Sequence, residues 1–375
     1  MTKIARTFPT GGIVEHNDLV DREAVLKELF ARTFEHGNSV VVSGPRQIGK
    51  SSLAHELKRR VNKAGGWGIY IDLSRVVGDE RELAHFVARA TYDQARGATG
   101  AFAHLREFIS GAPRPVFYQS DLDLAVTFHG GKEQPTTVLL EEAFGLADNL
   151  AASKDRRAVV ILDEFQELRK VSRHAFAKVR SILQEHMGNA AYVFMGSEVG
   201  MLDALFRDPK MMPFRLATPV DPGLPSQEAW RAYITRCFAA NGVSIRADEI
   251  DELIAFTGGH PRDLMETCEH LLTIRSLNPD ADGAVELSKA KALNSLEVRF
   301  DELWRRLEQP SGTQATAMRI ANGQQIYGRG RPRKTVTRTI EALRRGGIIR
   351  RTGRGAYEFL EPLFGEYLRN LSSYA

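Results

Sequence analysis

The chain has 375 residues, 43% of them apolar and 26% charged, which predicts two or three packed units of an ordinary globular protein. No apolar stretch is long enough to cross a bilayer, and the first residues, MTKIARTFPTGG, lack the hydrophobic core of a secretory signal, so we expect a cytoplasmic protein. The two cysteines, Cys237 and Cys268, have no neighbours at metal-ligand spacing and predict free thiols without a functional role.

The net charge of +4 is unevenly distributed along the chain. Residues 311–375 hold twelve Lys or Arg against four Asp or Glu, whereas the preceding part is mildly acidic. A basic C-terminal unit favours an anionic partner, of which nucleic acid is the commonest. A solvated charged face is the alternative interpretation.

The first predicted elements are a helix, a strand and a second helix. Residues 20–35 place their apolar side chains on one helical stripe, and the β-branched run 39–43 that follows is typical of a buried strand. After a glycine-rich turn, Leu53, Leu57 and Val61 recur at helical spacing. Strand, loop and helix in this order predict an α/β unit.

Three more strands are predicted, at residues 67–73, 158–162 and 191–195, with helical patterns between them. Apolar runs of this kind suit strands that are covered on both faces, so we expect a largely parallel sheet. Residues 96–135 interrupt the order with Gly, Ala and Pro and with the alternating segment VFYQSDLDLAVTF. This insertion is expected to hold a small hairpin or helices, either as a mobile specificity element or as a surface elaboration without chemistry.

The rest of the chain predicts two smaller units. Residues 225–309 have a helical pattern, typical of a lid domain, whose clearest apolar stripe consists of Leu296, Phe300, Leu303 and Leu307. Beyond Pro310 come two helices and a glycine-turned hairpin, the order of a winged helix. The expected domains are therefore a P-loop ATPase core at 1–222, a helical lid at 223–309 and a winged helix at 310–375.

One segment matches the phosphate-binding pattern G-x-x-x-x-G-K-[ST] at every fixed position. It consists of Gly44, Pro45, Arg46, Gln47, Ile48, Gly49, Lys50 and Ser51, followed by Ser52. The glycines let the backbone curl so that its N–H groups point at phosphate oxygens, and the next helix offers its positive end. Lys50 would reach the β- and γ-phosphates, and the hydroxyl of Ser51 would ligate Mg²⁺, so the segment predicts ATP and Mg²⁺ as cofactors.

A second chemical element is the apolar strand that ends in Asp163 and Glu164. The carboxyl ends of parallel strands open onto the ligand crevice, so Asp163 would hold the magnesium with its water shell and Glu164 would polarise the attacking water. The alternative is that the acidic pair caps the following helix through its dipole.

Three further positions carry weaker signals. Ser197, at the end of the next strand, would bond the γ-phosphate or orient water, or else it caps the helix that follows. Arg215 would stabilise phosphoryl charge in cis or from a neighbouring subunit of a homo-oligomer, or else forms a surface salt bridge. Arg262, after Pro261 at the start of a lid helix, would swing onto the phosphates or serve a structural role.

These segments together resemble the archaeal-type ATPases of the STAND class, relatives of the AAA+ replication initiators. The resemblance rests on VDRE (20–23), GPRQIGKSSL (44–53), ILDEFQEL (161–168), GSE (196–198), TGGHP (257–261) and the closing YEFLEPLFGEYLR. It implies an AAA+-like core, a lid and a winged helix, with Ser197 and Arg262 as sensors and with Val20 and Asp21 near the adenine pocket. Arg215 would fall where such ATPases often place an arginine finger, although PFRLA departs from their usual spacing there.

The predicted winged helix carries basic side chains suited to double-stranded DNA. In its second helix Val336, Ile340 and Leu343 would face the unit's core. The residues expected to contact DNA are Arg331, Arg333, Lys334, Arg338 and Arg354. A protein-binding or autoinhibitory role for this unit is the alternative.

The sequence thus predicts a Mg-dependent, DNA-associated ATPase that acts as a nucleotide-driven switch. The rival hypothesis is a signalling switch with slow or no turnover that recruits a protein partner. A small-molecule kinase is less favoured, because the Asp-Glu pair suits water better than an acceptor hydroxyl. The absence of an Asn-Lys-x-Asp motif favours adenine over guanine.

Overall fold

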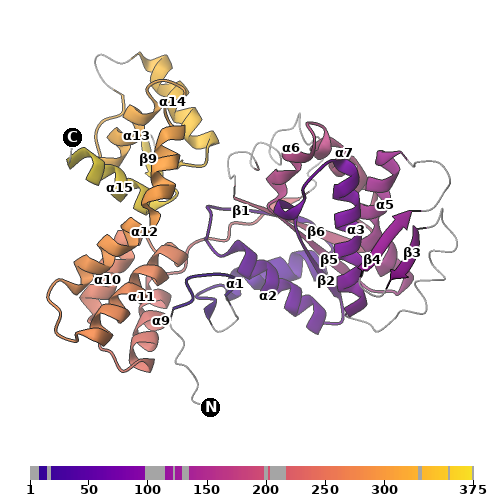
Figure 1. The fold of residues 1–375 in the computed structure, drawn as a ribbon, viewed down its shortest axis with the longest axis horizontal. Coiled ribbons are helices and arrows are strands. Elements are labelled where there is room, and N and C mark those ends of the chain that lie inside the picture. The colour runs from indigo at the N-terminus through magenta and orange to yellow at the C-terminus, as the bar shows by residue number, and fades with distance from the viewer. Residues whose placement is uncertain are drawn as a thin grey trace.

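The computed structural model describes most of the chain and places a sheet-containing core beside two helical groups (Figure 1). The described residues are 8–14, 18–97, 115–120, 123–128, 135–197, 202, 217–327, 332–353 and 355–373, with the backbone alone described at 96–97, 115–120 and 123–128. No helix among them has the length and apolar character needed to cross a membrane.

The core is built on a five-stranded sheet in the order β2-β5-β6-β1-β7, in which every pair is parallel. Its strands are β1 (Val40–Ser43), β2 (Trp67–Asp72), β5 (Ala158–Asp163), β6 (Ala190–Gly196) and β7 (Thr218–Pro219). The four strands predicted from apolar runs are confirmed, as is the parallel sheet. Strand β6 lies between β1 and β5, so the phosphate-binding loop and the acidic pair follow strands that are not neighbours.

Helices cover both faces of the sheet, which explains the unbroken apolar runs of its strands. On one face Val159 and Ile161 pack under α1 (Glu23–Phe30) and α2 (Lys50–Lys63), and on the other Val160 and Leu162 face the remaining helices. Those are α3 (Glu80–Gly97), α5 (Thr136–Ser153), the short α6 (Leu168–Val171) and α7 (Ala175–Glu185). One π-helical turn, Ala31–Glu35, extends α1.

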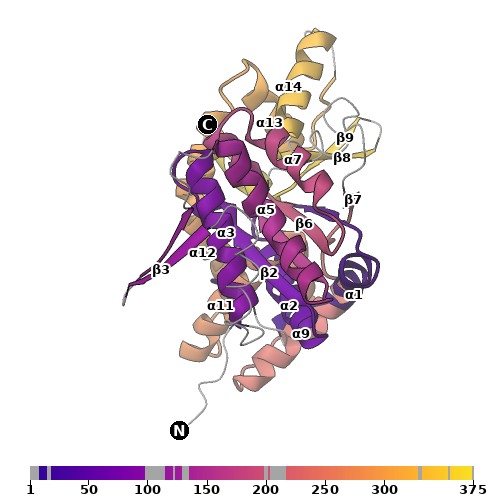
Figure 2. The ribbon, with the colours of Figure 1, turned by 90° about the vertical axis from the view of Figure 1, so that its right-hand side faces the viewer.

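The insertion contains an antiparallel hairpin of β3 (Pro115–Ser120) and β4 (Asp123–Phe128). The hairpin among the expected alternatives is therefore present. Figure 2 shows it projecting from the side of the core beside α3. Most other residues between 98 and 134 lie outside the described part of the chain.

Four helices follow the core and make up the unit predicted to be a lid, which is called the lid below. They are α9 (Gln227–Ala240), α10 (Ala247–Thr257), α11 (Pro261–Leu277) and α12 (Ala284–Arg306). Their buried cluster includes Trp230, Phe238 and Cys268, and it takes in Phe8 from the N-terminal segment. Both cysteines are free thiols, as expected, and burial raises the pKa of the Cys268 thiol.

The C-terminal unit has the predicted order of two helices and a hairpin, followed by one more helix. Its elements are α13 (Thr313–Ala321), α14 (Arg333–Arg345), β8 (Ile349–Gly353), β9 (Ala356–Phe359) and α15 (Pro362–Ser373). Val336, Ile340 and Leu343 are buried, as the helical stripe predicted. Leu296 and Phe300, expected in the lid, pack in this C-terminal cluster instead, because α12 is long enough to run from one cluster into the other. The domain boundaries and the winged-helix assignment stay predictions.

Close packing of α2 on β2 makes the stability of the core sensitive to Gly68. A Cβ atom there would lie 2.7 Å from the carbonyl oxygen and 2.8 Å from the Cα of Lys58. Gly68→Ala must shift backbone, so we expect a loss of about 1–3 kcal/mol in the free energy of unfolding, measured by urea denaturation. Gly188→Ala is the control, because its Cβ would meet only Asp148 at 3.8 Å. Equal midpoints for the two variants would contradict the packing argument.

Candidate nucleotide-binding site

The loop between β1 and α2 has the curled backbone that a phosphate cradle needs. Gly49 lies at φ +98° and is the N-cap of α2, and Gln47 also has a positive φ of +63°. A Cβ on Gly44 would lie 3.2 Å from the side chain of Ile48 and 3.3 Å from that of Pro222, so a larger residue would crowd the turn. The fourteen residues of α2 therefore begin at the end of this loop, so the free N–H groups of the helix lie where a phosphate held by the loop would bind.

Lys50 lies across this loop. Its Nζ donates to the carbonyl oxygens of Gly44 and Pro45, both at 2.8 Å, and the residue is only 5% exposed. Burial lowers the pKa of its ammonium group to about 8, although the carboxylates of Glu164 and Asp163 act in the opposite direction. A cation desolvated in this way is stabilised by an incoming anion.

Asp163 is joined to the phosphate-binding loop. Its Oδ2 accepts from the hydroxyls of Ser51 and Tyr70, each at 2.8 Å, and its Oδ1 accepts from the amide of Glu164 at 2.9 Å. The carboxylate is 2% exposed. The sequence reasoning brought Ser51 and Asp163 together correctly, but it gave no role to Tyr70.

Glu164 points to the end of β6. The hydroxyl of Ser197 donates to its Oε2 at 3.1 Å, and the amide of Gln166 donates to the same oxygen and, at 3.2 Å, to Ser197. Glu164 precedes a 3₁₀ turn but makes no capping hydrogen bond with its side chain. The acid is therefore held by Ser197 and Gln166. The sequence analysis gave no role to Gln166. Its only signal was that a polar residue stands two positions after Glu164.

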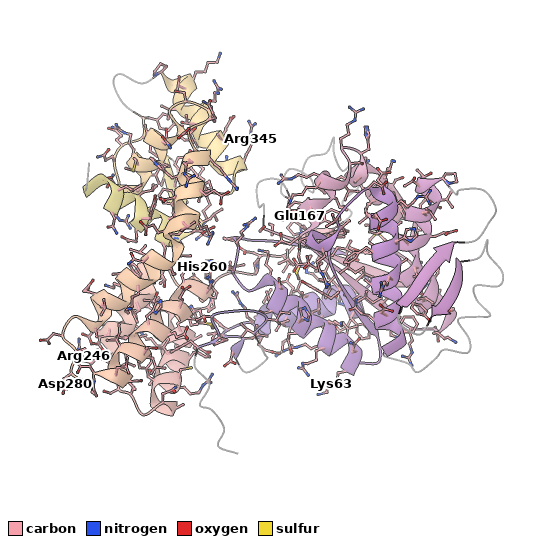
Figure 3. All side chains as sticks on the ribbon, viewed as in Figure 1. Lys63, Glu167, Arg246, His260, Asp280 and Arg345 are labelled. Atoms are coloured by element: carbon pink, nitrogen blue, oxygen red, sulfur yellow. The ribbon has the colours of Figure 1, made fainter. Side chains whose placement is uncertain are left out.

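The lid touches the loop at the start of α11. His260 Nε2 lies 3.0 Å from the carbonyl oxygen of Arg46, and Arg262 donates to the side chain of Gln47 at 2.7 Å. Pro261 occupies the first turn of α11, as expected. Figure 3 shows His260 where the lid meets the core. Its role was not anticipated, because nothing in TGGHP shows which segment the imidazole will face.

Arg22 connects the loop to the segment that leads into the lid. Its guanidinium donates to the carbonyl oxygens of Pro222, Gly223 and Ile48, the last two at 2.9 Å. The side chain is buried, which lowers its pKa. Asp21, expected near adenine, accepts from the amide of Ser226 at 2.8 Å instead. The VDRE segment thus fastens the start of the lid.

These parts enclose a cavity of about 530 Å³, a size typical of small-molecule sites. Its lining includes residues 9–12, Val14, residues 18–20, Arg22, residues 46–52, Glu164, Pro225, Trp230, Pro261, Arg262 and Met265. The Oγ of Ser52 accepts from the amide of Val14 at 3.0 Å. Most of the predicted nucleotide-binding residues therefore surround one space, and Val20 is part of its wall.

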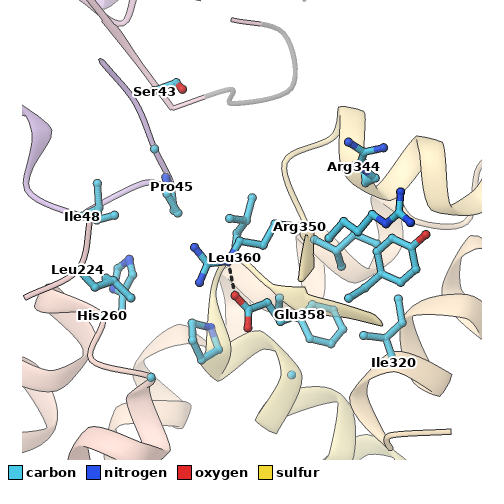
Figure 4. Close-up of a pocket in the computed structure, with 18 of the residues that line it drawn as sticks. Ser43, Pro45, Ile48, Leu224, His260, Ile320, Arg344, Arg350, Glu358 and Leu360 are labelled. Atoms are coloured by element: carbon cyan, nitrogen blue, oxygen red, sulfur yellow. Dashed lines mark hydrogen bonds and ion pairs between the residues drawn. The ribbon is translucent and has the colours of Figure 1, made fainter. Parts of the chain in front are cut away.

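A larger cavity of about 1180 Å³ lies between the core, the lid and the C-terminal unit. Figure 4 shows Ser43, Pro45 and Ile48 on its core side and Arg344 and Arg350 opposite. It contains neither Lys50 nor the acidic pair. Lys50 and Glu164 line the smaller cavity, which makes it the candidate nucleotide site.

The donor atoms fit magnesium. Ser51 and Asp163 offer oxygen atoms, which Mg²⁺ prefers, and it usually takes one or two protein ligands beside phosphates and water. No cluster of three or more His, Cys, Asp or Glu side chains that would hold a metal occurs within the described residues. Arg215, the predicted arginine finger, lies outside those residues.

Comparison with known proteins agrees with this geometry. Residues 19–190 match the AAA ATPase domain family. This segment is similar to AAA ATPase domains. No protein with a curated function matches the sequence.

Solved structures extend the likeness of fold beyond the AAA ATPase domain. A Walker-type ATPase of Pyrococcus abyssi is 19% identical, with 96% of this chain and 98% of that chain covered and a TM-score of 0.67. The ORC2 protein of Aeropyrum pernix, solved with ADPNP and ADP, is 12% identical, with 97% and 96% covered and a TM-score of 0.58. Together with the family match, these structures confirm the expected AAA+-like P-loop fold, which the chain shares with a Walker-type ATPase and with an ORC2 protein. The STAND assignment stays a prediction.

The depressed pKa of Lys50 predicts how nucleotide binding to the AAA ATPase domain depends on pH. The pKa of Lys50 is about 8 in the folded protein, against an ordinary lysine value of 10.5. Between these two pH values Lys50 loses its proton in the folded protein and keeps it in the unfolded chain. The contribution of Lys50 to the free energy of unfolding therefore rises with pH in this range. Binding of a triphosphate needs the charged form. Affinity for ATP should therefore fall above pH 8, by at most about tenfold per unit, with proton uptake on binding.

Calorimetry from pH 7 to 9.5, in buffers of different ionisation enthalpy, measures both effects. Lys50→Arg is the matched control, because a guanidinium stays charged throughout this range. The affinity of Lys50→Arg for ATP should be lower than that of the wild type, but it should not decline with pH, because residue 50 keeps its charge. Wild-type affinity that stays level up to pH 9.5, without proton uptake, would contradict the assignment.

Proposed function

We propose that this protein binds ATP with Mg²⁺ in the 530 Å³ cavity, hydrolyses it slowly and uses it as a conformational switch. The observation that carries the proposal is the convergence of four elements on one space: the curled loop, the buried Lys50, the Ser51–Asp163 pair and the start of α11. The AAA ATPase domain at residues 19–190 supports the same function.

The polar and apolar parts of the cavity suggest how ATP would lie. The triphosphate would occupy the loop, with Lys50 and the amides between Gly44 and Ser51 as donors. The base would lie toward Val20, Trp230 and Met265, which give that end an apolar lining. When bound, Mg²⁺ would supply charge neutralisation of the phosphates beside Ser51 and Asp163.

Glu164 would hold and orient the attacking water. In the present arrangement its carboxylate accepts from Ser197 and Gln166, so hydrolysis requires it to turn toward the loop. Such a requirement suits a switch with slow turnover, because the base must first leave two hydrogen bonds. Ser197 lies at the end of β6, between the loop and Asp163, where it would sense a γ-phosphate.

The lid would report the nucleotide state. His260 and Arg262 already contact the tip of the loop, and Arg22 joins the loop to the segment leading into the lid. A γ-phosphate offers Arg262 a stronger partner than Gln47 because the hydrogen bond would be charge-assisted at both ends. The contact between Arg262 and the γ-phosphate would then favour a closed lid while ATP is bound. Loss of that contact after hydrolysis would favour an open lid.

The basic C-terminal unit would associate with double-stranded DNA. Arg333, Lys334 and Arg338 are exposed on α14, and none pairs with a carboxylate among the described residues. Arg331 and Arg354, also predicted to contact DNA, lie outside the described residues. Unpaired cations along one helix suit phosphate contacts.

Two substitutions separate binding from turnover. Lys50→Ala removes the cation and should lower ATP affinity by at least about a hundredfold, since charge-assisted bonds to phosphate are lost. Glu164→Gln keeps the volume and removes the base, so ATP should still bind while hydrolysis falls by about a hundredfold or more. Calorimetry and phosphate release measure the two effects. Undiminished hydrolysis by Glu164→Gln would remove Glu164 from its role.

Salt dependence tests the association with DNA. Replacing Arg333, Lys334 and Arg338 by Gln should weaken binding to random duplex DNA. It should also reduce the slope of log K against log salt by up to about 2.7, at about 0.9 per lost phosphate contact. Fluorescence anisotropy at two or more salt concentrations provides the measurement.

A control variant carries the same change of net charge at exposed lysines of the core and the lid: Lys63→Gln, Lys154→Gln and Lys291→Gln. Its slope should equal that of the wild type. If the wild type fails to bind duplex DNA even at low salt, the rival function is favoured, a signalling switch whose C-terminal unit recruits a protein or inhibits the core.

A further inference from the structure

Tyr70 contacts the acidic pair from a strand that the phosphate-binding motifs do not include. It lies on β2, at the edge of the sheet, and its hydroxyl donates to Asp163 Oδ2 at 2.8 Å. The same oxygen accepts from Ser51 of α2, which is the proposed magnesium ligand of the phosphate-binding loop. One carboxylate oxygen is therefore shared between the loop and a neighbouring strand.

Side chains from two helices fix the position of Tyr70. The amide group of Gln94 on α3 accepts from the backbone N–H of Tyr70 at 2.9 Å and donates to its carbonyl oxygen at 2.8 Å. These backbone groups face away from β5, so Gln94 takes the place of a missing strand. Lys58 donates to Gln94 at 2.6 Å, and the ring of His55 lies 4.4 Å from the Tyr70 ring between centroids.

We propose that Tyr70 is a positioning residue of the magnesium site, an inference that rests on the function proposed above. Besides the bond from Ser51, each oxygen of Asp163 accepts one hydrogen bond. Oδ1 accepts from the amide of Glu164, and Oδ2 accepts from the phenol of Tyr70. A hydroxyl has one hydrogen and two lone pairs, so Ser51 could offer oxygen to a metal and still donate to Asp163. The phenol of Tyr70 would be the second side-chain donor that keeps the carboxylate plane in place.

The hydroxyl of Tyr70 thus acts on the metal through Asp163 and not through the fold. Removing one oxygen atom leaves the ring, its contact with His55 and the Gln94 hydrogen bonds to the backbone intact. The carboxylate would then keep only the Ser51 hydroxyl and the Glu164 amide as donors, so its plane would be less firmly held. Hydrogen-bond partners of metal ligands typically contribute about tenfold to a hundredfold in metal affinity.

The test measures the Mg²⁺ concentration at which ADP binding is half-maximally tightened, by calorimetry of the full chain with ADP at a series of Mg²⁺ concentrations. For Tyr70→Phe this concentration should rise by about tenfold, while ADP affinity in EDTA stays that of the wild type. Gln94→Leu, which keeps the phenol but removes its support, should give a smaller rise in the same direction.

Tyr192→Phe is the matched control. Tyr192 is buried in the same sheet and its hydroxyl donates to the carbonyl oxygen of Phe144 at 2.9 Å, with no contact to Asp163. Its half-maximal Mg²⁺ concentration should equal that of the wild type. An unchanged value for Tyr70→Phe, or an equal rise in Tyr192→Phe, would overturn the positioning role and leave the proposed function standing. Absence of ADP binding by the wild type would overturn both.

Discussion

The hydrogen bond between Ser51 and Asp163 is the contact on which the site depends. It joins residues 112 positions apart in the chain. Asp163 ends β5 and Ser51 lies in α2 after β1, and β6 separates these two strands. Hydrogen bonds therefore join the loop to Asp163 and join Glu164 to Ser197 along one edge of the sheet. Lys50 and the two acids lie together at this edge, while helices cover both faces of the sheet.

Much of this could be predicted because the signals are local. The glycine pattern from Gly44 to Ser51 and the apolar runs of the strands each follow from neighbouring residues, so the fold class and most residues that line the candidate site could be predicted. Tyr70, Gln166 and His260 were not, because their roles come from strand order and from the docking of the lid. A polar residue in a buried strand or turn signals that it needs a partner, but only the tertiary structure supplies the partner's identity.

Arg22 shows how a buried charge can join two segments of the chain. Its guanidinium is surrounded by backbone carbonyl oxygens of the loop and of the segment before the lid, and burial lowers its pKa because the charged form is desolvated. Separating the lid from the loop would leave this cation with fewer acceptors, which is costly in a buried site. The contact therefore holds the loop to the segment that leads into the lid.

The same reasoning extends to the C-terminal unit through α12. Ala284 at its start packs in the lid cluster, while Leu296 and Phe300 pack in the C-terminal cluster, and Arg299 and Asp301 contact Glu361 and Tyr367 on the far side. A continuous helix buried at both ends transmits rotation better than a flexible linker does. Since a cavity of about 1180 Å³ separates the C-terminal unit from the loop, a small turn of the lid would move the basic face of α14 without breaking the core.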